Sequence, residues 1–583
     1  MQTFYSAEKS VQIVIFLLKA HNIRKFVVSP GTTNITLVAS IQQDPFFEIY
    51  SAADERSAAY IACGLAEESN EPVALSCTGA TASRNYVSAL TEAFYRKIPI
   101  LAITATQNVD KVGHLIPQVI DRSTHLNDTV RHSVYVPSIT DDSQVWGCEI
   151  KVNNALLELR RNGGGPVHIN LATTYCPDFS VKTLPTYRAI YRVQHEKDFP
   201  ELKHKRIAIF IGSHSRWNSE ELKSIDAFCE KYGAVVLYDQ TSGYKGKYGV
   251  LSSLIYTQSS IYTDIQEVDL LIHIGEVSGE YGILNRLTAH NVWRVSEDGE
   301  LRDTFRHLKF VFEMSEKRFF DYYNTIAGAA DNGVNLYAAY RQCYDKVYDA
   351  IPELPFSNVW IAKQLAPKLP EASALHLGIL NSLRSWNFFE VAPHIDVYSN
   401  VGGFGIDGCV SALIGASLAN RERLYFGVVG DLAFFYDMNS LGNRHVGSNI
   451  RLMLVNNGVG TEFKNYNHPA SRFGEDADDY MAAAGHYGNK SPQLVKHYAE
   501  DLGFEYITAS NKEEFALAAE RFLTAESIDK PILFEVFTQS SDESNAVYAM
   551  NNIYKDGTKK VANIARSLLG DTVIEAVKSI IKK

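Results

Sequence analysis

Two apolar segments that each end in polar residues constrain the fold of this chain most strongly. The segment Val-Val-Gly-Asp-Leu begins at Val428, and after a helix-length spacer the segment Leu-Val-Asn-Asn-Gly-Val begins at Leu454. Strands joined by such a spacer run parallel, so their carboxyl ends meet at one edge of a sheet, where open α/β sheets bind ligands. We therefore expect Asp431 and Asn457 to lie side by side at this edge.

These two side chains indicate a magnesium site. The Asp431 carboxylate and the Asn457 carboxamide are hard oxygen ligands, and a backbone carbonyl just after Asn457 would be a third, which leaves octahedral positions for phosphate oxygens and water. Gly-Asp alone more often turns a chain, and Asn-Asn alone more often caps a helix. Because both stand at strand ends with this separation, the sequence predicts Mg²⁺ that binds a diphosphate.

A glycine-rich turn offers an alternative cofactor. Residues 403–408 fit G-x-G-x-x-G, follow the strand-like segment 395–398 and precede the helical run 409–420, as a dinucleotide-binding turn would. The acidic residue that should bind a ribose then falls at Asp431, which the metal site explains better. A lone motif of this kind is weak evidence, so we favour the diphosphate site.

Glu55 lies where a strand meets a helix. The segment 47–53 has the composition of a strand and leads into Asp-Glu-Arg-Ser, where a helix rich in Ala and Gly begins. A Glu at a helix start most often caps the helix or interacts with its dipole. Its place at a strand end, away from a solvated helix face, also makes it a candidate for function.

Both regions resemble the thiamine diphosphate (ThDP)-dependent enzymes. The segment that begins Gly-Asp at 430 and ends Asn-Asn at 457 is similar to their diphosphate-binding signature. The resemblance implies that Asp431, Asn457 and the carbonyl of Val459 bind the metal. In these enzymes the loop matching 403–408 lies under the cofactor and is held bent by a large apolar residue, here Ile406.

Residues 51–105 resemble the pyrimidine-binding domain of the same enzymes. The likeness implies that Glu55 bonds to N1′ of the aminopyrimidine, which favours the 4′-imino tautomer that removes the weakly acidic C2 proton of the thiazolium. Burial beside an apolar ring would raise the pKa of Glu55. The further cofactor-binding residues that the resemblance implies are Pro30, Gly31, Thr78, Gly79, Asn85, Asn381, Ser382, Gly405, Gly430, Leu432, Ala433 and Gly460.

Within this superfamily the chain resembles the MenD-like synthases, which join decarboxylated 2-oxoglutarate to isochorismate in the menaquinone pathway. The likeness covers both outer thirds well and the middle third weakly. The motifs that carry it are Ser29-Pro-Gly, Asp54-Glu-Arg-Ser-Ala-Ala, Asn381-Ser, Tyr398-Ser-Asn-Val-Gly-Gly-Phe-Gly-Ile-Asp-Gly, Gly430-Asp-Leu-Ala-Phe-Phe-Tyr-Asp-Met-Asn and Val455-Asn-Asn-Gly.

Three positions depart from that pattern, which uses arginines to bind substrate carboxylates in the bidentate manner that suits Arg. Thr32 and Thr33 stand where Ser-Arg is expected. Trp386 and Val401 replace two further arginines, and the nearby Arg384 is out of register by two. Carboxylates left unpaired in a buried site cost several kcal/mol. We therefore expect a reaction other than the menaquinone one.

Further polar residues are candidates for the active site. Gln118 lies in a loop where ThDP enzymes often place a polar group over the reacting centre, although a loop Gln more often faces solvent. Glu462 is a candidate for proton transfer, or it pairs with Lys464. His114 and His376 are candidate acid or base groups, although a lone His more often makes structural hydrogen bonds.

Length and composition agree with a multidomain enzyme. The 583 residues predict three or four domains, and 46% hydrophobic residues are enough for large α/β cores. The net charge of −11, with no Lys/Arg-rich run, argues against nucleic-acid binding. No signal-like start and no apolar run of about 18 residues is present, so we expect a cytoplasmic protein that does not cross a membrane.

Alternating apolar runs and helix-compatible stretches predict an α/β chain with three doubly wound parallel-sheet domains of the ThDP-enzyme type. We expect a pyrimidine-binding domain at 1–185, a central domain at 190–345 and a diphosphate-binding domain at 350–583, which ends in a Lys-rich helix. Some relatives bind FAD in the central domain. The turns at Gly212 and Gly275 lack a full phosphate-binding fingerprint, so FAD is not expected here.

The sequence thus predicts a ThDP- and Mg²⁺-dependent enzyme that decarboxylates a 2-oxo acid and transfers the acyl carbanion to a carbonyl or enone acceptor. The lost arginines favour a smaller or less anionic donor, such as pyruvate, or a carbohydrate-like acceptor. One alternative is a simple 2-oxo-acid decarboxylase, and another is a non-catalytic cofactor-binding regulatory homologue. The resemblance also implies a homodimer or homotetramer in which Glu55 and Asp431 of one site come from different chains.

Overall fold

The computed structural model describes residues 4–258, 263–327, 334–485, 491–526 and 529–554. The chain forms two compact units, of which the first contains residues 1–198 with 298–313 and the second contains the rest. The expected Lys-rich helix at the carboxyl terminus lies outside the described residues. The three predicted domain boundaries remain a prediction.

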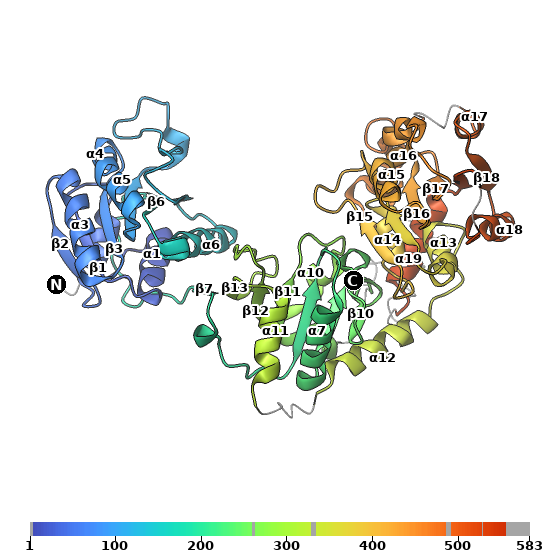
Figure 1. Cartoon of the computed structure of the whole chain (residues 1–583). Helices are drawn as coiled ribbons and strands as arrows, with labels where there is room; N and C mark the ends of the chain where they lie inside the picture. Colours follow the sequence, from blue (N-terminus) through green and yellow to red (C-terminus); the bar gives the residue numbers. More distant parts are fainter. Residues whose placement is uncertain (1–3, 259–262, 328–333, 486–490, 527–528, 555–583) are drawn as a thin grey trace, which may run out of the picture. The chain divides into compact units, whose positions relative to one another are not determined.

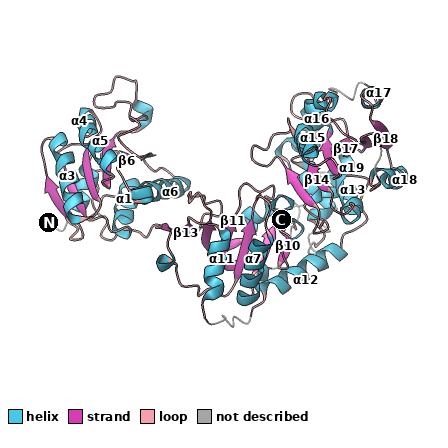
Figure 2. Ribbon diagram, viewed as in Figure 1, coloured by secondary structure: helices cyan, strands magenta, loops and turns pink. Residues whose placement is uncertain are grey.

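The first unit contains a six-stranded parallel sheet with the order β2-β1-β3-β4-β6-β5 (Figures 1 and 2). Every residue of its inner strands β3, β4 and β6 is buried, as parallel strands covered on both faces require. The strands are β1 (Lys25–Val28), β2 (Glu48–Ser51), β3 (Val73–Thr78), β4 (Ile100–Thr106), β5 (His132–Val136) and β6 (Val167–Ala172).

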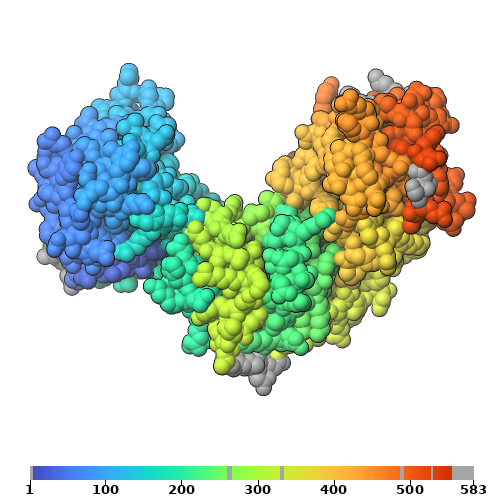
Figure 3. All heavy atoms as spheres, in the orientation of Figure 1, coloured from blue at the N-terminus to red at the C-terminus, as the bar shows by residue number. Residues whose placement is uncertain are grey.

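Helices cover both faces of this sheet because neighbouring strand residues point to opposite sides. Phe26 and Val28 pack with α1, α2 and α6, whereas Val27 packs with α3 and α5. Figure 3 shows this part of the chain, in blue, as a closely packed body. The helices are α1 (Lys9–Ala20), α2 (Ile35–Ile41), α3 (Glu55–Ser69), α4 (Thr81–Asn85), α5 (Val87–Arg96) and α6 (Asp142–Glu158).

The second unit contains a six-stranded parallel sheet with the order β15-β14-β16-β17-β19-β18. Counted along the chain, this order is the same as in the first unit. The strand order reverses between β14 and β16, because β15 lies on one side of β14 and β16 lies on the other. Ligands bind outside the carboxyl ends of strands at such switch points. The strands are β14 (Ala374–Leu377), β15 (Asp396–Ser399), β16 (Tyr425–Gly430), β17 (Ile450–Asn456), β18 (Glu505–Ala509) and β19 (Ile532–Phe537).

Helices again flank this sheet (Figure 2). One face is packed by α15, α16 and α17. The helices of this part are α13 (Asn358–Leu365), α14 (Asn381–Trp386), α15 (Cys409–Ala419), α16 (Asp431–Asp437), α17 (Leu494–Asp501), α18 (Lys512–Phe522) and α19 (Ser540–Asn551).

The second unit also contains the parallel strands β10-β9-β8-β11-β12, which lie within the predicted central domain. These strands are β8 (Ile207–Ile211), β9 (Val235–Tyr238), β10 (Gly249–Leu251), β11 (Glu267–Ile274) and β12 (Thr288–Val295). The helices beside them are α7 (Ser219–Tyr232), α8 (Ser253–Tyr256), α9 (Thr263–Gln266), α10 (Gly282–Arg286), α11 (Glu316–Thr325) and α12 (Leu336–Asp349).

Short 3₁₀ turns complete the described elements. They are η1 (Val109–Lys111), η2 (Arg161–Gly163), η3 (Glu196–Asp198), η4 (Gln240–Ser242), η5 (Ala366–Lys368), η6 (Met438–Gly442), η7 (Thr461–Lys464) and η8 (Pro469–Ala477). The parallel sheets and their flanking helices confirm the predicted α/β class of ThDP enzymes. None of the helices in the described part of the chain combines the length and the apolar character needed to cross a lipid bilayer.

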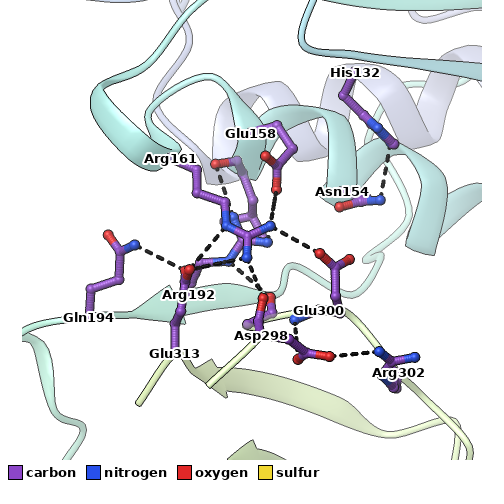
Figure 4. A network of polar contacts seen from close by, with 12 residues as sticks. His132, Asn154, Glu158, Arg161, Arg192, Gln194, Asp298, Glu300, Arg302 and Glu313 are labelled. Carbon is purple, nitrogen blue, oxygen red and sulfur yellow. Dashed lines mark hydrogen bonds and ion pairs between the residues drawn. The ribbon is translucent and has the colours of Figure 1, made fainter. Parts of the chain in front are cut away.

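Residues 298–313 belong to the first unit and contain strand β13. Strand β7 (Tyr191–Val193) pairs in parallel with β13 (Leu308–Phe312). Beside them Arg161 lies within 3.2 Å of Glu158, 3.1 Å of Glu300 and 3.1 Å of Glu313 (Figure 4). Arg192 on β7 is 3.0 Å from Glu158. Because the Arg161 side chain is only 13% exposed, its positive charge would be costly to bury without these carboxylate partners.

Replacing Arg161 with alanine should therefore lower the free energy of unfolding by about 3–5 kcal/mol, the range for removing one partner from a buried ion pair. Arg302→Ala is the matched control, since Arg302 is 47% exposed and pairs with Asp298. Its loss should cost at most about 1 kcal/mol. Urea unfolding followed by circular dichroism measures both, and equal losses in the two variants would contradict the role given to burial.

Candidate active site

The polar residues after β16 and β17 meet at the carboxyl edge of the sheet formed by β14–β19. The register places Gly430 opposite Val455, so Asp431 begins α16 beside the end of β17. One carboxylate oxygen of Asp431, Oδ2, accepts hydrogen bonds from the backbone N–H of Asn457 at 3.2 Å and of Gly458 at 2.6 Å. The expected contact between Asp431 and the Asn-Asn turn is present.

Asp431 is a buried carboxyl group, only 6% exposed. Burial raises its pKa to about 6, although the N–H donors around it act in the opposite direction. A second buried carboxyl, Glu543 on α19, lies in the same pocket, and burial raises its pKa to about 7. Two carboxyl groups held out of water at one site favour a bound cation.

The other expected metal ligands converge on one hydroxyl group. Thr461 Oγ1 donates to Asn457 Oδ1 at 2.7 Å and lies 3.4 Å from the carbonyl oxygen of Val459. Gly458 has φ +76, a conformation that favours glycine and turns the chain between them. No group of three or more His, Cys, Asp and Glu side chains within the described ranges fits a metal. The oxygens of Asp431, Asn457 and the Val459 carbonyl nevertheless suit Mg²⁺ that takes its further oxygen ligands from a diphosphate.

A cavity of about 170 Å³ is lined by most of the cofactor residues predicted beside the sheet formed by β14–β19. Ile406 lines it, opposite groups from α14, α16 and the loop after β17. Gly405 does not line it. The predicted residues that do are Asn381, Ser382, Ile406, Gly430, Asp431, Leu432, Ala433, Asn457, Val459, Gly460 and Glu462.

A residue that the sequence did not single out supports this cavity. Both carboxylate oxygens of Glu543 accept from the N–H of Asn358 at 3.0 Å, and Asn358 Nδ2 donates to Ser382 Oγ at 3.3 Å. Glu543 thus connects α19 through the start of α13 to a predicted cofactor residue. It stands more than a hundred residues from Asp431, and no local pattern links the two.

The other predicted cofactor residues lie at the carboxyl edge of the first sheet. Glu55 is the first residue of α3 and follows β2, and Asn85 Nδ2 lies 3.4 Å from its carboxylate. Glu55 is partly exposed within the first unit. A Cβ at Gly31 would stand 2.1 Å from Thr78 Oγ1, so the turn after β1 requires glycine.

Three neighbours complete this edge. Pro30 and Gly31 follow β1, and Gly79 follows β3. A Cβ at Gly79 would come within 2.6 Å of the guanidinium of Arg122, which is only 5% exposed. Burial lowers the pKa of Arg122 to about 10, and its Nη atoms donate to Thr104 and Asn170. The sequence reading missed Arg122.

Comparisons with known proteins show the family of this chain. Residues 9–125 match the model of the thiamine pyrophosphate enzyme N-terminal TPP-binding domain. The 2-succinyl-5-enolpyruvyl-6-hydroxy-3-cyclohexene-1-carboxylate synthase of Bacteroides thetaiotaomicron is 31% identical over 557 residues, which are 93% of this chain and 98% of that protein. The chain belongs to the MenD-like family of ThDP-dependent enzymes.

Further relatives have the same name. The synthase of Phocaeicola vulgatus is 31% identical over 93% of this chain and 97% of its own. Among solved structures, the thiamine diphosphate-dependent 4-hydroxybenzoylformate decarboxylase of Rhodococcus jostii RHA1 aligns over 91% of this chain and 99% of its own, with a TM-score of 0.40 and 16% identity. The predicted membership of the ThDP enzymes, and the MenD-like character, are confirmed by the family match and the relatives.

The residues that stand where the resemblance implies arginines carry no charge, and neither Trp386 nor Val401 lines the cofactor cavity. Trp386 is fully buried, and its indole Nε1 has no hydrogen-bond partner in the part of the chain that the structure describes. Val401 is 4% exposed and lies near Gly279, whose Cβ would stand 3.5 Å from it. Thr33 is buried and its hydroxyl donates to the carbonyl of Ala105 at 2.6 Å, whereas Thr32 is exposed.

Glu462 and Arg384 form a bidentate ion pair. Arg384 donates to the two carboxylate oxygens of Glu462 at 2.6 and 2.9 Å, and to Asn381 Oδ1 at 3.0 Å. Burial alone would raise the pKa of Glu462, but the hydrogen bonds and charge of Arg384 outweigh it and lower that pKa. The alternative pairing with Lys464 is wrong, because Lys464 binds Asp478.

The remaining candidates lie in loops or in the core. Gln118 is exposed, with φ +63, in the loop between η1 and β5. His114 is exposed in the same loop. His376 is on β14, and burial lowers its pKa to about 4. It is therefore neutral near pH 7 and unsuited to the acid role that the sequence allowed.

Proposed function

We propose that this MenD-like chain uses ThDP and Mg²⁺ to decarboxylate a 2-oxo acid and to transfer the remaining acyl unit to a carbonyl or enone acceptor, in a reaction other than that of the menaquinone pathway. One observation carries the proposal. The cavity that gathers the predicted diphosphate-binding residues occurs together with the buried, uncharged Trp386 and Val401, which stand where the resemblance implies carboxylate-binding arginines.

The roles of the residues follow from their chemistry. Asp431, Asn457 and the carbonyl of Val459 would hold Mg²⁺, which binds the diphosphate. ThDP, when bound, would supply an electron sink that stabilises a carbanion at the donor's carbonyl carbon as CO₂ leaves. Glu55 would hold a proton at N1′ of the pyrimidine, and Ile406 would support the bound cofactor.

The donor should carry one carboxylate. In 2-oxoglutarate the second carboxylate would need a cationic partner, and neither Trp386 nor Val401 offers one. Arg384 is already paired with Glu462. An unpaired buried carboxylate costs several kcal/mol, so a short donor such as pyruvate is favoured.

A donor and acceptor screen tests the proposal. The protein with ThDP and Mg²⁺ is given pyruvate, 2-oxobutyrate or 2-oxoglutarate, with and without aldehyde and ketone acceptors. We expect CO₂ release fastest with the short donors, and new carbon–carbon products by mass spectrometry. Faster reaction of 2-oxoglutarate with isochorismate would overturn the proposal. Aldehyde as the sole product would favour a simple decarboxylase, and bound ThDP without CO₂ release would favour a regulatory homologue.

We further propose that the active unit is at least a homodimer with shared sites. The first unit provides Glu55 and the second provides Asp431, and neither half alone holds both ends of ThDP. The helix that starts with Glu55 exposes Tyr60 by 47% and Ile61 by 48%. Exposed apolar side chains close to a half-site are consistent with cover by a second chain.

Complementation tests the shared site. Glu55→Gln and Asp431→Ala proteins, each inactive, are mixed after dissociation and allowed to re-form dimers. Heterodimers should regain one good site, because the intact halves then face each other, and about half the sites per mixed dimer should turn over. Mixed dimers confirmed by mass spectrometry but without activity, or an active monomer in sedimentation, would count against the arrangement.

A further inference from the structure

A larger cavity of about 480 Å³ adjoins the cofactor cavity within the second unit. Loops of the central domain, around α8 and α10, form one side, and α14 and the segment 466–469 form another. Glu462 lines both cavities, so its ion pair with Arg384 stands at the boundary between them. A molecule bound here lies next to the cofactor.

The charged groups of this cavity already have partners. Arg384 is held by Glu462 and Asn381. Glu280 is fully buried and accepts from the hydroxyl of Ser253 and from the N–H of Gly282. No pair of charges in this set is arranged to bind an added carboxylate in the bidentate manner. An anionic ligand bound by Arg384 would have to break the contacts with Glu462, and Arg286, another cation of the lining, donates to the carbonyl of Gln258.

Two amide side chains of the cavity keep unused hydrogen-bonding atoms. Asn387 is 1% exposed, and its Oδ1 accepts from the N–H of Gln240 at 3.0 Å, which directs Nδ2 elsewhere. Among the described residues that Nδ2 has no hydrogen-bond partner, and neither does the buried Oδ1 of Asn551. Buried polar atoms are almost always hydrogen-bonded. One unused donor and one unused acceptor on the same cavity therefore point to a ligand with hydroxyl groups.

The rest of the lining has the same character. Asn285 and Asn467 add amide groups, each of which donates and accepts. Tyr281 and Phe388 add aromatic faces, which cover the C–H faces of a ring. Apolar faces with a few polar groups that fix orientation are typical of small-molecule sites. This combination matches a neutral polyhydroxylated ring better than a dicarboxylate.

We propose that this cavity binds the acceptor of the transfer reaction, and that the acceptor is a neutral sugar-like compound with an aldehyde or ketone group. This inference rests on the proposed function. The donor loses CO₂, and its carbonyl carbon forms the new bond to the acceptor carbonyl carbon. The electron pair of that carbonyl moves to its oxygen, which takes up a proton and becomes a hydroxyl group.

Direct binding tests the inference without turnover. Saturation-transfer NMR measures binding of D-glucose, D-galactose and D-mannose, with D-glucuronate as the anionic probe. Asn387→Leu removes the unused donor, and Asn551→Leu removes the unused acceptor in case the first variant does not fold. Each should weaken hexose binding at least tenfold. Asn420→Leu is the control, because Asn420 is exposed and lies outside this cavity.

The outcomes separate this inference from the proposed function. Hexose binding that Asn387→Leu and Asn551→Leu weaken at least tenfold, and that Asn420→Leu retains, supports the inference. Binding of no hexose, equal binding by all variants, or preference for glucuronate overturns it. If hexoses bind as expected but no 2-oxo acid releases CO₂, the proposed function fails and the ligand class stands. If CO₂ is released but hexoses do not bind, only the acceptor inference fails.

Discussion

Replacing Asp431 with alanine should abolish ThDP binding in the presence of Mg²⁺ and leave the fold intact. Asp431 is the one carboxylate among the three expected metal ligands, and without it the Asn457 amide and the Val459 carbonyl offer only neutral oxygens. Loss of a residue that merely supports a ligand costs roughly 10- to 100-fold in metal affinity, so loss of the ligand itself should exceed 100-fold. Isothermal calorimetry with ThDP and Mg²⁺ measures the change.

Asp431→Asn separates charge from loop support. The amide keeps an oxygen that accepts from Asn457 N and Gly458 N, but lacks the negative charge. It should lose ThDP affinity nearly as strongly as alanine. Since burial disfavours the Asp431 carboxylate, the apoprotein with Asn should melt no lower than the parent. Asp479→Ala, at an exposed position, is the control, and unchanged affinity in Asp431→Ala would refute the metal assignment.

Glu55→Gln should leave ThDP bound but slow activation of its C2 proton by about 10²–10⁴-fold, the range for one acid or base group. Glutamine keeps the shape and the contact with Asn85, but it cannot hold the proton shared with N1′. Exchange of C2–H for deuterium, followed by NMR after rapid acid quench, measures this step without any substrate.

The control for this variant is Glu68→Gln, which changes an exposed carboxylate on the same helix. It should exchange C2–H at the parent rate. Because exchange needs a complete site, the experiment is done on the oligomer at a concentration where sedimentation shows no monomer. Exchange at the parent rate in Glu55→Gln would refute its role in activation.

The sequence predicted the features that depend on strand order. Asp431 and Asn457 were expected together because consecutive parallel strands end at one edge, and the register confirms this contact. Glu543 was missed because α19 reaches the cavity only through tertiary packing. The alternative pairing of Glu462 with Lys464 was wrong because residues two apart on the turn η7 do not face each other.

Two glycine turns of the central domain show why a motif alone is weak evidence. A Cβ at Gly212 would stand 2.0 Å from the carbonyl oxygen of Glu276, and one at Gly275 would stand 3.0 Å from that of Gly212. Close backbone packing therefore requires these glycines, with or without a ligand. The sequence shows the glycines but not what approaches them, so the prediction that no FAD binds remains a prediction.

The discontinuous first unit has a consequence for synthesis on the ribosome. Domains generally begin to fold as they emerge, amino-terminal end first. Here β7 has no β13 to pair with, and Arg161 lacks Glu300 and Glu313, until residue 313 has been made. The six strands of the amino-terminal sheet have all been made once β6 ends, but the β7–β13 pair and the ion pairs of Arg161 with Glu300 and Glu313 form only after residues 199–297 have been translated. A gene fragment that stops at residue 198 would leave β7 and Arg161 without these partners.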